Sequence, residues 1–133
     1  MKLLMTGFII FFASLVCFAQ KNPQIRVCHQ HGVEFTVADV PGDQYGFCKV
    51  GFSFVGAIDM MNYFWEQKTP QSIENYIAGN TKCPNVEELS MPLLDGGVQT
   101  FCFFEDGSVM DSITLQLGRN NSANQPLNQF LGL

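Results

Sequence analysis

The chain has 133 residues and a formal net charge of −5, and only 14% of its residues are charged, against ~25% in an average soluble domain. This length allows one domain or two very small ones. A sequence pI of about 4.7 argues against nucleic-acid binding and against attachment to anionic lipid, because both depend on clustered lysine and arginine. We therefore expect no nucleic-acid partner.

The first 19 residues have the three-part pattern of a secretory signal peptide. Lys2 precedes an apolar run over residues 3–18, and Cys17-Phe18-Ala19 places small residues at positions −3 and −1 of a cleavage site. A transmembrane anchor is one rival interpretation, but about 16 apolar residues are short for a ~30 Å hydrocarbon core. A bacterial lipoprotein signal is another, but the residue before a lipidated cysteine is normally small, and here it is Val16.

Cleavage after Ala19 removes 19 of the 133 residues and leaves 114. The loss of Lys2 changes the formal charge from −5 to −6. We expect a mature protein that begins at Gln20, is secreted or periplasmic, and does not insert into a membrane.

Four cysteines remain after cleavage, namely Cys28, Cys48, Cys83 and Cys102. An even number in an exported chain of this size indicates two disulfides, and four cysteines allow three pairings. A degenerate internal repeat in the sequence favours one of these three pairings. The two consecutive cysteine pairs are spaced by 20 and 19 residues, and a glycine stands six residues before the second cysteine of each pair.

An aspartate also follows each cysteine pair, at Asp59 and Asp111. These matches predict two related halves. If each pair of cysteines belongs to one half, the disulfides are Cys28–Cys48 and Cys83–Cys102.

The first half has signals for two helices and a pair of strands. Asn22-Pro23 is typical of a helix start, and Gly32 of a helix end, so we expect a helix over residues 23–31. Alternating apolar residues predict a strand over residues 33–38, a turn at residues 41–43 and a partner strand over residues 45–50. Apolar residues at helical spacing predict a second helix over residues 57–66.

The second half contains the clearest hairpin signal. A helix is expected from Thr69-Pro70 to Gly79-Asn80. Strands are expected over residues 98–104 and 109–115, because Asp106-Gly107 between them supplies the positive φ angles of a tight turn. The Asn- and Gln-rich residues after 118 are expected to form an irregular tail docked by Phe130 and Leu131.

These elements predict an α+β fold of small, disulfide-stapled helix-plus-antiparallel-hairpin units, with two related halves packed together. The expected organisation is a signal peptide (1–19), a first helix-hairpin unit (20–67), a helical connector (68–82), a second hairpin unit (83–118) and an irregular tail (119–133).

The stretch Gly42-Asp43-Gln44-Tyr45-Gly46-Phe47-Cys48, together with Asn22-Pro23 and Cys28, resembles a small bacterial domain of unknown function whose members are often labelled putative haemolysin. The resemblance covers residues 22–66 and extends weakly over residues 83–115. It implies export and a compact module, and it implies no established reaction.

No set of residues indicates catalysis, a metal or a cofactor. His29 and His31 flank Gln30 beside Cys28, but side chains two apart on the expected helix diverge by about 200°, and a disulfide removes the thiolate. Ser53 misses the Gly-x-Ser-x-Gly nucleophile pattern by one residue. The adjacent acidic pairs Glu87-Glu88 and Glu105-Asp106 are typical of solvated surface.

Most of the aromatic residues are expected to pack in the core, because aromatic side chains dominate small cores. The candidates for a binding surface are Tyr45, Trp65, Phe101 and Phe103. A strand over Phe101 and Phe103 places apolar groups on both of its faces, so the second face needs a cover. We expect an exported, non-enzymatic module that binds a protein or cell-surface ligand. The alternatives are a small secreted hydrolase and a membrane-active, haemolysin-like protein.

Overall fold

The computed structural model describes residues 22–40, 43–83 and 87–133. The predicted signal peptide and the Pro41-Gly42 part of the first turn lie outside the described residues.

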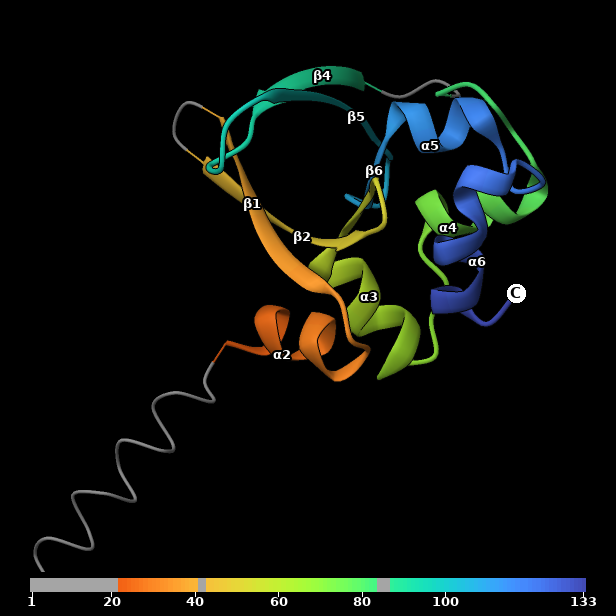
Figure 1. The fold of residues 1–133 in the computed structure, drawn as a ribbon, viewed down its shortest axis with the longest axis horizontal. Helices are drawn as coiled ribbons and strands as arrows, with labels where there is room; N and C mark the ends of the chain where they lie inside the picture. Colours follow the sequence, from red (N-terminus) through yellow and green to blue (C-terminus); the bar gives the residue numbers. More distant parts are fainter. Residues whose placement is uncertain (1–21, 41–42, 84–86) are drawn as a thin grey trace, which may run out of the picture.

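Three strands and their neighbouring helices form each half of the chain (Figure 1). The first half contains α2 (Pro23–Gln30), β1 (Glu34–Val40), β2 (Asp43–Val50), β3 (Ser53–Gly56) and α3 (Ala57–Phe64). The second half contains α4 (Gln71–Ala78), β4 (Glu87–Pro92), β5 (Val98–Phe103), β6 (Val109–Asp111) and α5 (Ser112–Leu117). A 3-10 turn, η1 (Ser122–Asn124), and a last helix, α6 (Gln125–Leu131), end the chain.

The six strands form one antiparallel sheet in the order β1-β2-β3-β6-β5-β4. The central strands β3 and β6 join the halves through a single residue pair, Val55 and Met110. The outer strands also meet, because Ala38 of β1 bridges to Leu93 and the N–H of Leu94 donates to the carbonyl of Val37 over 3.1 Å. The sheet therefore curls round on itself (Figure 1), and the predicted α+β class is confirmed.

The inner face of the curled sheet encloses its own core. Each strand contributes one buried side chain: Ala38, Phe47, Phe54, Met91, Phe101 and Val109. The rings of Phe47 and Phe101 stack with centroids 4.5 Å apart, and Phe54 meets both rings edge-on. The second face of the strand that contains Phe101 is therefore covered by the other strands of the same curled sheet.

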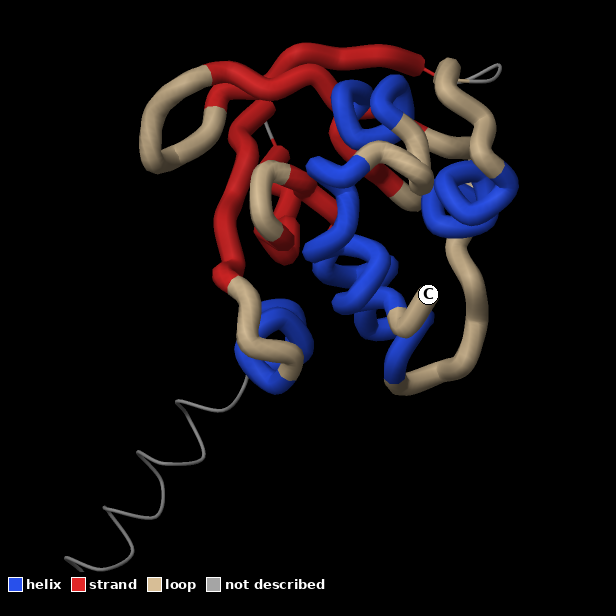
Figure 2. The backbone as a smooth tube through the Cα atoms, turned by 45° about the vertical axis from the view of Figure 1, so that its right-hand side comes forward, coloured by secondary structure: helices blue, strands red, loops and turns tan. Residues whose placement is uncertain are grey.

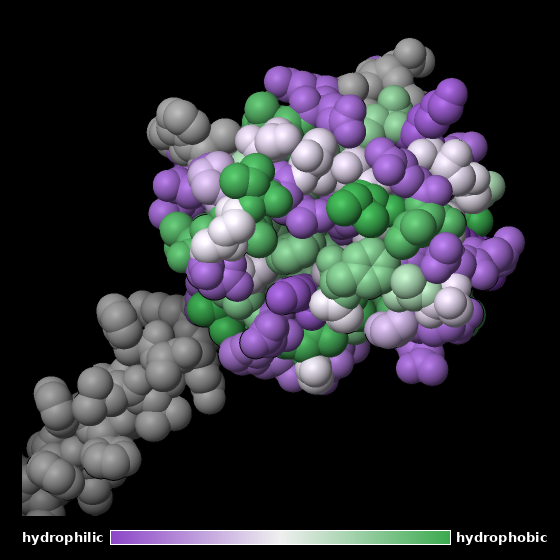
Figure 3. Space-filling view, turned by 45° about the horizontal axis from the view of Figure 1, so that its top comes forward, coloured by the Kyte–Doolittle hydropathy of each residue, from purple (hydrophilic) through white to green (hydrophobic). Residues whose placement is uncertain are grey.

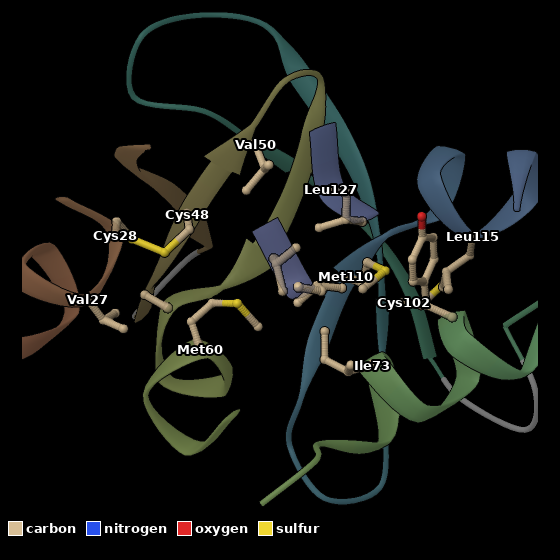
Figure 4. Close-up of a cluster of buried hydrophobic side chains, with 14 of the residues drawn as sticks. Val27, Cys28, Cys48, Val50, Met60, Ile73, Cys102, Met110, Leu115 and Leu127 are labelled. Carbon is tan, nitrogen blue, oxygen red and sulfur yellow. A yellow bond between two sulfur atoms is a disulfide. The ribbon is translucent and has the colours of Figure 1, made fainter. Parts of the chain in front are cut away.

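The helices lie outside the curled sheet and cover part of its outer face (Figure 2). Alternation along β5 sends Cys102 to this side, where it joins Met110, Leu115 and Leu127 in a second, larger core (Figure 4). Helix α6 brings Leu127 against Met110 in that core (Figure 4).

Both disulfides belong to this outer core, and both predicted pairings are confirmed. Cys28–Cys48 ties α2 to β2, and Cys83–Cys102 ties the segment after α4 to β5. Each closes a loop of about 20 residues and is expected to contribute roughly 3 kcal/mol to the free energy of unfolding. Two disulfides are typical of exported proteins. None of the described helices is long and apolar enough to cross a bilayer.

The three helices predicted in the first 80 residues are confirmed, and their observed ends lie within two residues of the predicted ones. Asn22 caps α2 by accepting hydrogen bonds from the N–H groups of Gln24 (3.0 Å) and Ile25 (3.4 Å), and Pro23 takes the first helical position. Helix α4 lies within the expected connector and ends at Gly79, whose φ of 80° favours glycine.

Two predictions in the second half are wrong. The strand expected over residues 109–115 stops at Asp111, because the Asp111 carboxylate accepts from the N–H of Thr114 and begins helix α5. The expected irregular tail is helical over η1 and α6, with Asn121 capping η1 and with Leu127 and Leu131 buried. The expected docking by Phe130 and Leu131 is confirmed, since both contact the outer core. Strand β4 was not predicted at all.

Candidate functional site

The two aspartates of the repeat pattern meet where the halves join, at the short β3–β6 contact. In an antiparallel pair centred on Val55 and Met110, Phe54 lies opposite Asp111, and Gly56 lies opposite Val109. The backbone N–H of Phe54 donates to Asp111 Oδ1 over 2.8 Å, and the N–H of Val109 donates to Asp59 Oδ2 over 2.9 Å. Each half therefore supplies a carboxylate that accepts from the backbone of the other half.

Asp111 is fully buried, and its carboxylate has several donors. Besides Phe54, it accepts from the N–H of Thr114 (2.9 Å) and from Thr114 Oγ1 (2.7 Å), which lies 2.8 Å from Ser53 Oγ. Burial raises the pKa of Asp111, and the hydrogen bonds from Phe54 and Thr114 offset part of that rise. Asp111 thus joins the two halves and also begins α5.

Asp59 differs from Asp111 because it has fewer donors. It lies in the first turn of α3 with only 6% of its surface exposed. Among the described residues, no hydrogen bond reaches its Oδ1 atom. Burial raises the pKa of Asp59 to about 7, although the hydrogen bond from Val109 lowers it, and the nearby charge of Asp106 adds to the rise.

Asp59 forms part of the wall of a cavity of about 280 Å³. Helix α2, strand β2, the β3–α3 junction and the β5–β6 turn all contribute to this wall. The lining residues are Gln24, Asp43, Gln44, Tyr45, Gly46, Phe47, Gly56, Ile58, Asp59, Asn62, Asp106, Gly107 and Val109. We call this cavity the Asp59 pocket. The Gln44-Tyr45-Gly46 stretch that carried the family resemblance therefore lies beside a buried carboxyl group.

Gly46 is needed for close packing at the Asp59 pocket. A Cβ atom added at Gly46 would lie 2.7 Å from the Phe35 ring and would also clash with Gln24 Oε1. The missing side chain thus lets α2 and β1 pack against β2, and this contact places Gln24 in the pocket wall.

Asp106 holds the turn that forms the other side of the pocket. Its Oδ1 accepts from Ser108 N–H (2.9 Å) and Ser108 Oγ (2.6 Å), and its Oδ2 accepts from Gln71 N–H (2.8 Å) at the start of α4. Burial opposes its ionisation, but these hydrogen bonds outweigh burial and lower the pKa of Asp106. Both of its oxygens therefore stabilise the turn.

Two larger hollows, of about 500 and 360 Å³, lie near Cys83 and near Arg119. Neither is lined by a buried ionisable side chain. On the face drawn in Figure 3, hydrophobic side chains lie in small groups between hydrophilic ones. The large exposed hydrophobic residues come from several parts of the chain: Ile58, Leu94, Val98, Ile113, Leu117 and Leu133. The Asp59 pocket is therefore the best-defined candidate site.

The candidate aromatic surface is only partly assembled. Tyr45 lines the Asp59 pocket, and its ring meets Phe103 edge-on with centroids 5.3 Å apart. Phe101 is fully buried in the inner core, so its assignment to a binding surface is wrong. Trp65 lies at the end of α3, outside the pocket wall, where the Arg26 guanidinium stands 4.9 Å from its ring centre.

The other candidate residues lie apart from the pocket. His29 and His31 are exposed, and the His31 ring stacks on Phe64 with centroids 3.8 Å apart. Ser53 is fully buried beside Thr114, where a substrate has no access. Glu87 and Glu88 are exposed on β4. No group of three or more His, Cys, Asp or Glu side chains among the described residues is arranged to hold a metal.

Sequence reasoning marked Asp59 as part of the repeat but missed it as a site residue. A usable signal was present, because Asp59 is the only charged residue between Lys49 and Glu66. A lone carboxyl group in a largely apolar stretch of sequence is costly to bury. Such a group is a candidate for a function beyond solubility.

Replacing Gly56 by alanine is expected to lower the free energy of unfolding by about 1–3 kcal/mol. The backbone of Gly56 (φ −52°, ψ 129°) suits any residue, so the cost is steric. The added Cβ would lie 3.0 Å from Asp59 Cγ, clash with Oδ2 and displace the carboxylate from Val109. Urea unfolding gives the measurement.

The control for this variant is the same change in an Asp59→Ala background, where the clash is absent. There Gly56→Ala should cost less than about 0.5 kcal/mol. An equal loss in both backgrounds would show that Asp59 does not set the requirement for glycine.

In comparisons with known proteins, no family model, no curated protein and no solved structure matched this chain.

Proposed function

We propose that the protein is an exported, non-enzymatic module that binds a small polar group of its ligand in the Asp59 pocket. The observation that carries the proposal is the buried Asp59 carboxyl in the wall of a partly open cavity, with one oxygen atom free of partners among the described residues. Neutral hydrogen-bonding side chains from Gln24, Gln44 and Asn62 line the same cavity. A mostly preformed cavity with a few convergent polar groups is typical of ligand sites.

The scaffold around the pocket supports a binding role. The Cys28–Cys48 disulfide fixes α2 against β2, and these two elements supply Gln24 and Tyr45 to the wall. Rigid walls reduce the entropy lost on binding. The volume of about 280 Å³ lies at the lower end of the ~300–1,000 Å³ range of ligand pockets, so the bound group is small.

A secreted hydrolase is the second candidate, and one observation favours it. The pKa of Asp59 is raised and that of Asp106 is lowered in the same pocket, as in enzymes that use one carboxyl as acid and another as base. Against it, both oxygens of Asp106 already accept hydrogen bonds from Ser108 and Gln71. A base engaged in this way is poorly placed to take a proton from substrate.

A titration of the ¹⁵N-labelled, oxidised protein with methyl glycosides, amino-acid amides and short alkylamines tests the binding role. One ligand class is expected to shift the amide signals of residues 43–47, 56–62 and 106–109. Tyr45→Ala should weaken that binding about tenfold, since it removes an aromatic wall of the pocket. Trp65→Phe is the matched aromatic control and should leave binding unchanged.

Two results would contradict the binding role. Signals that shift only outside these segments would place the ligand elsewhere on the protein. Conversion of a probe to product, lost in Asp59→Asn, would favour the hydrolase instead.

A further inference from the structure

Among the described residues, the charged side chains that line the Asp59 pocket are all acidic. Three of its thirteen lining residues are aspartates, Asp43, Asp59 and Asp106, and none of the thirteen is Lys, Arg or His. The electrostatic potential in such a concave site attracts cations and repels anions. The buried Asp59 adds a specific requirement, because a carboxylate removed from water is stabilised by a cation placed against it.

The hydrogen bonds of Asp59 favour an ammonium group over a guanidinium group as the bound cation. A guanidinium group binds carboxylates best through two parallel bonds to both oxygens. Here Oδ2 already accepts from Val109, and among the described residues Oδ1 has no donor. One free oxygen suits an ammonium group, which acts as a compact charge with three donors. The amide oxygens of Gln44 and Asn62 in the same wall are acceptors for its other donors.

A divalent metal ion fits the Asp59 pocket less well than an ammonium group does. Protein sites for Zn²⁺ and Ca²⁺ usually bring together three or more side-chain ligands, among them Cys, His, Asp or Glu. No such group of three is present among the described residues.

The rim of the pocket suits an unbranched alkyl chain behind the ammonium group. Ile58 lines the pocket and is 57% exposed, so it presents an apolar surface at the entrance. Lysine side chains lay their methylene groups along such surfaces and keep the charged group in a polar environment. The small volume excludes a bulky headgroup.

We propose that the Asp59 pocket binds the ammonium group of an unbranched alkylamine, as carried by the lysine side chain of a polypeptide, with Asp59 as the counter-ion. This inference rests on the binding role proposed above. It implies that the ligand is a protein or peptide that presents an accessible lysine.

Binding should be coupled to loss of a proton from Asp59. The other titratable groups that line the pocket are Asp43, Tyr45 and Asp106. Among the described residues, no cationic side chain lines it that could pair with Asp59 in place of the ligand. A pKa of about 7 leaves most of the Asp59 carboxyl protonated at pH 6 and ionised at pH 8. The lysine ammonium stays charged across this range. The dissociation constant should therefore rise about tenfold from pH 8 to pH 6.

Calorimetric titration with Nα-acetyl-lysine methylamide tests the inference. The matched probes are Nα-acetyl-norleucine methylamide, which has nearly the same chain without charge, and Nα-acetyl-arginine methylamide. We expect the lysine probe to bind at least about tenfold more tightly than either. Asp59→Asn should weaken it about 10–100-fold. Asp95→Asn, an exposed carboxylate outside the pocket wall, should leave it unchanged.

Asn62→Leu provides a second variant that leaves the Val109 hydrogen bond in place, and it should weaken the lysine probe about 2–10-fold. Equal binding of the norleucine probe would overturn the cation inference and leave the binding role standing. Tighter binding of the arginine probe, or no binding of the lysine probe, would overturn the ammonium assignment. The binding role itself fails only if no probe class perturbs the pocket or if a probe is turned over.

Discussion

Asp111→Ala is expected to lower the free energy of unfolding by about 2–4 kcal/mol. The substitution removes the cap of α5, which is typically worth about 1 kcal/mol. It also leaves the N–H of Phe54 buried without an acceptor, at a cost of about 1–3 kcal/mol. The loss is large because β3 and β6 are paired at only one residue on each strand, so the hydrogen bond from Phe54 to Asp111 extends a very short ladder.

Urea unfolding followed by the fluorescence of Trp65, the only tryptophan, measures this loss. Asp111→Asn keeps one acceptor oxygen and should cost less than the alanine variant. Asp95→Ala, an exposed aspartate in a turn, is the control and should change the free energy of unfolding by less than about 0.5 kcal/mol. If Asp111→Ala stays within that range, the carboxylate does not join the halves.

Local patterns predicted the first half of the fold well. Asn22-Pro23 at the start of α2 and the alternation along β1 are short-range signals whose meaning does not depend on the rest of the chain. The disulfide pairing followed from the repeated spacing of cysteines. The internal duplication on which that argument relied stays a prediction, although both halves have three antiparallel strands in the same order.

The error in the tail came from residues whose role depends on earlier parts of the chain. Asn124 and Asn128 made the tail appear solvated, yet both are buried and bonded to distant backbone or side-chain groups. Asn124 Nδ2 donates to the Gly118 carbonyl over 2.7 Å, and Asn128 Oδ1 accepts from the Tyr76 hydroxyl over 2.6 Å. Polar side chains that form such hydrogen bonds can be buried in the core, and sequence alone does not show their partners.

The candidate site could not be predicted from the sequence, because it depends on contacts between residues far apart in the chain. Tyr45 was selected as an aromatic residue, but the pocket beside it depends on the β3–β6 junction, which joins residues more than 50 positions apart in the sequence. Phe101 was selected with it because the curling of the sheet was not foreseen. Only closure of β1 onto the end of β4 turns that face of β5 into an interior.

The stability of the protein is expected to fall as the pH rises from about 4 to 7, because of Asp59. Its pKa is about 7 in the folded state and about 3.8 in the unfolded state, so the folded state binds one more proton in this interval. The stabilisation from the protonated carboxyl is complete below pH 3.8 and is lost as the pH approaches 7. The slope approaches about 1.4 kcal/mol per pH unit, or about 4 kcal/mol over the whole interval.

Asp59→Asn isolates this effect from other titrating groups, including Asp111, whose raised pKa acts in the same direction. Asparagine resembles the protonated aspartate and retains an oxygen that accepts from Val109. The variant should match the wild type near pH 4 and become more stable than it by about 2–4 kcal/mol at pH 8. Urea unfolding at several pH values gives both curves, and a difference between them that does not change with pH would exclude a raised pKa for Asp59. An alkylamine that pairs with the ionised carboxyl should restore part of the lost stability of the wild type at pH 8 and have no effect on the variant, because a ligand stabilises only the folded state that binds it.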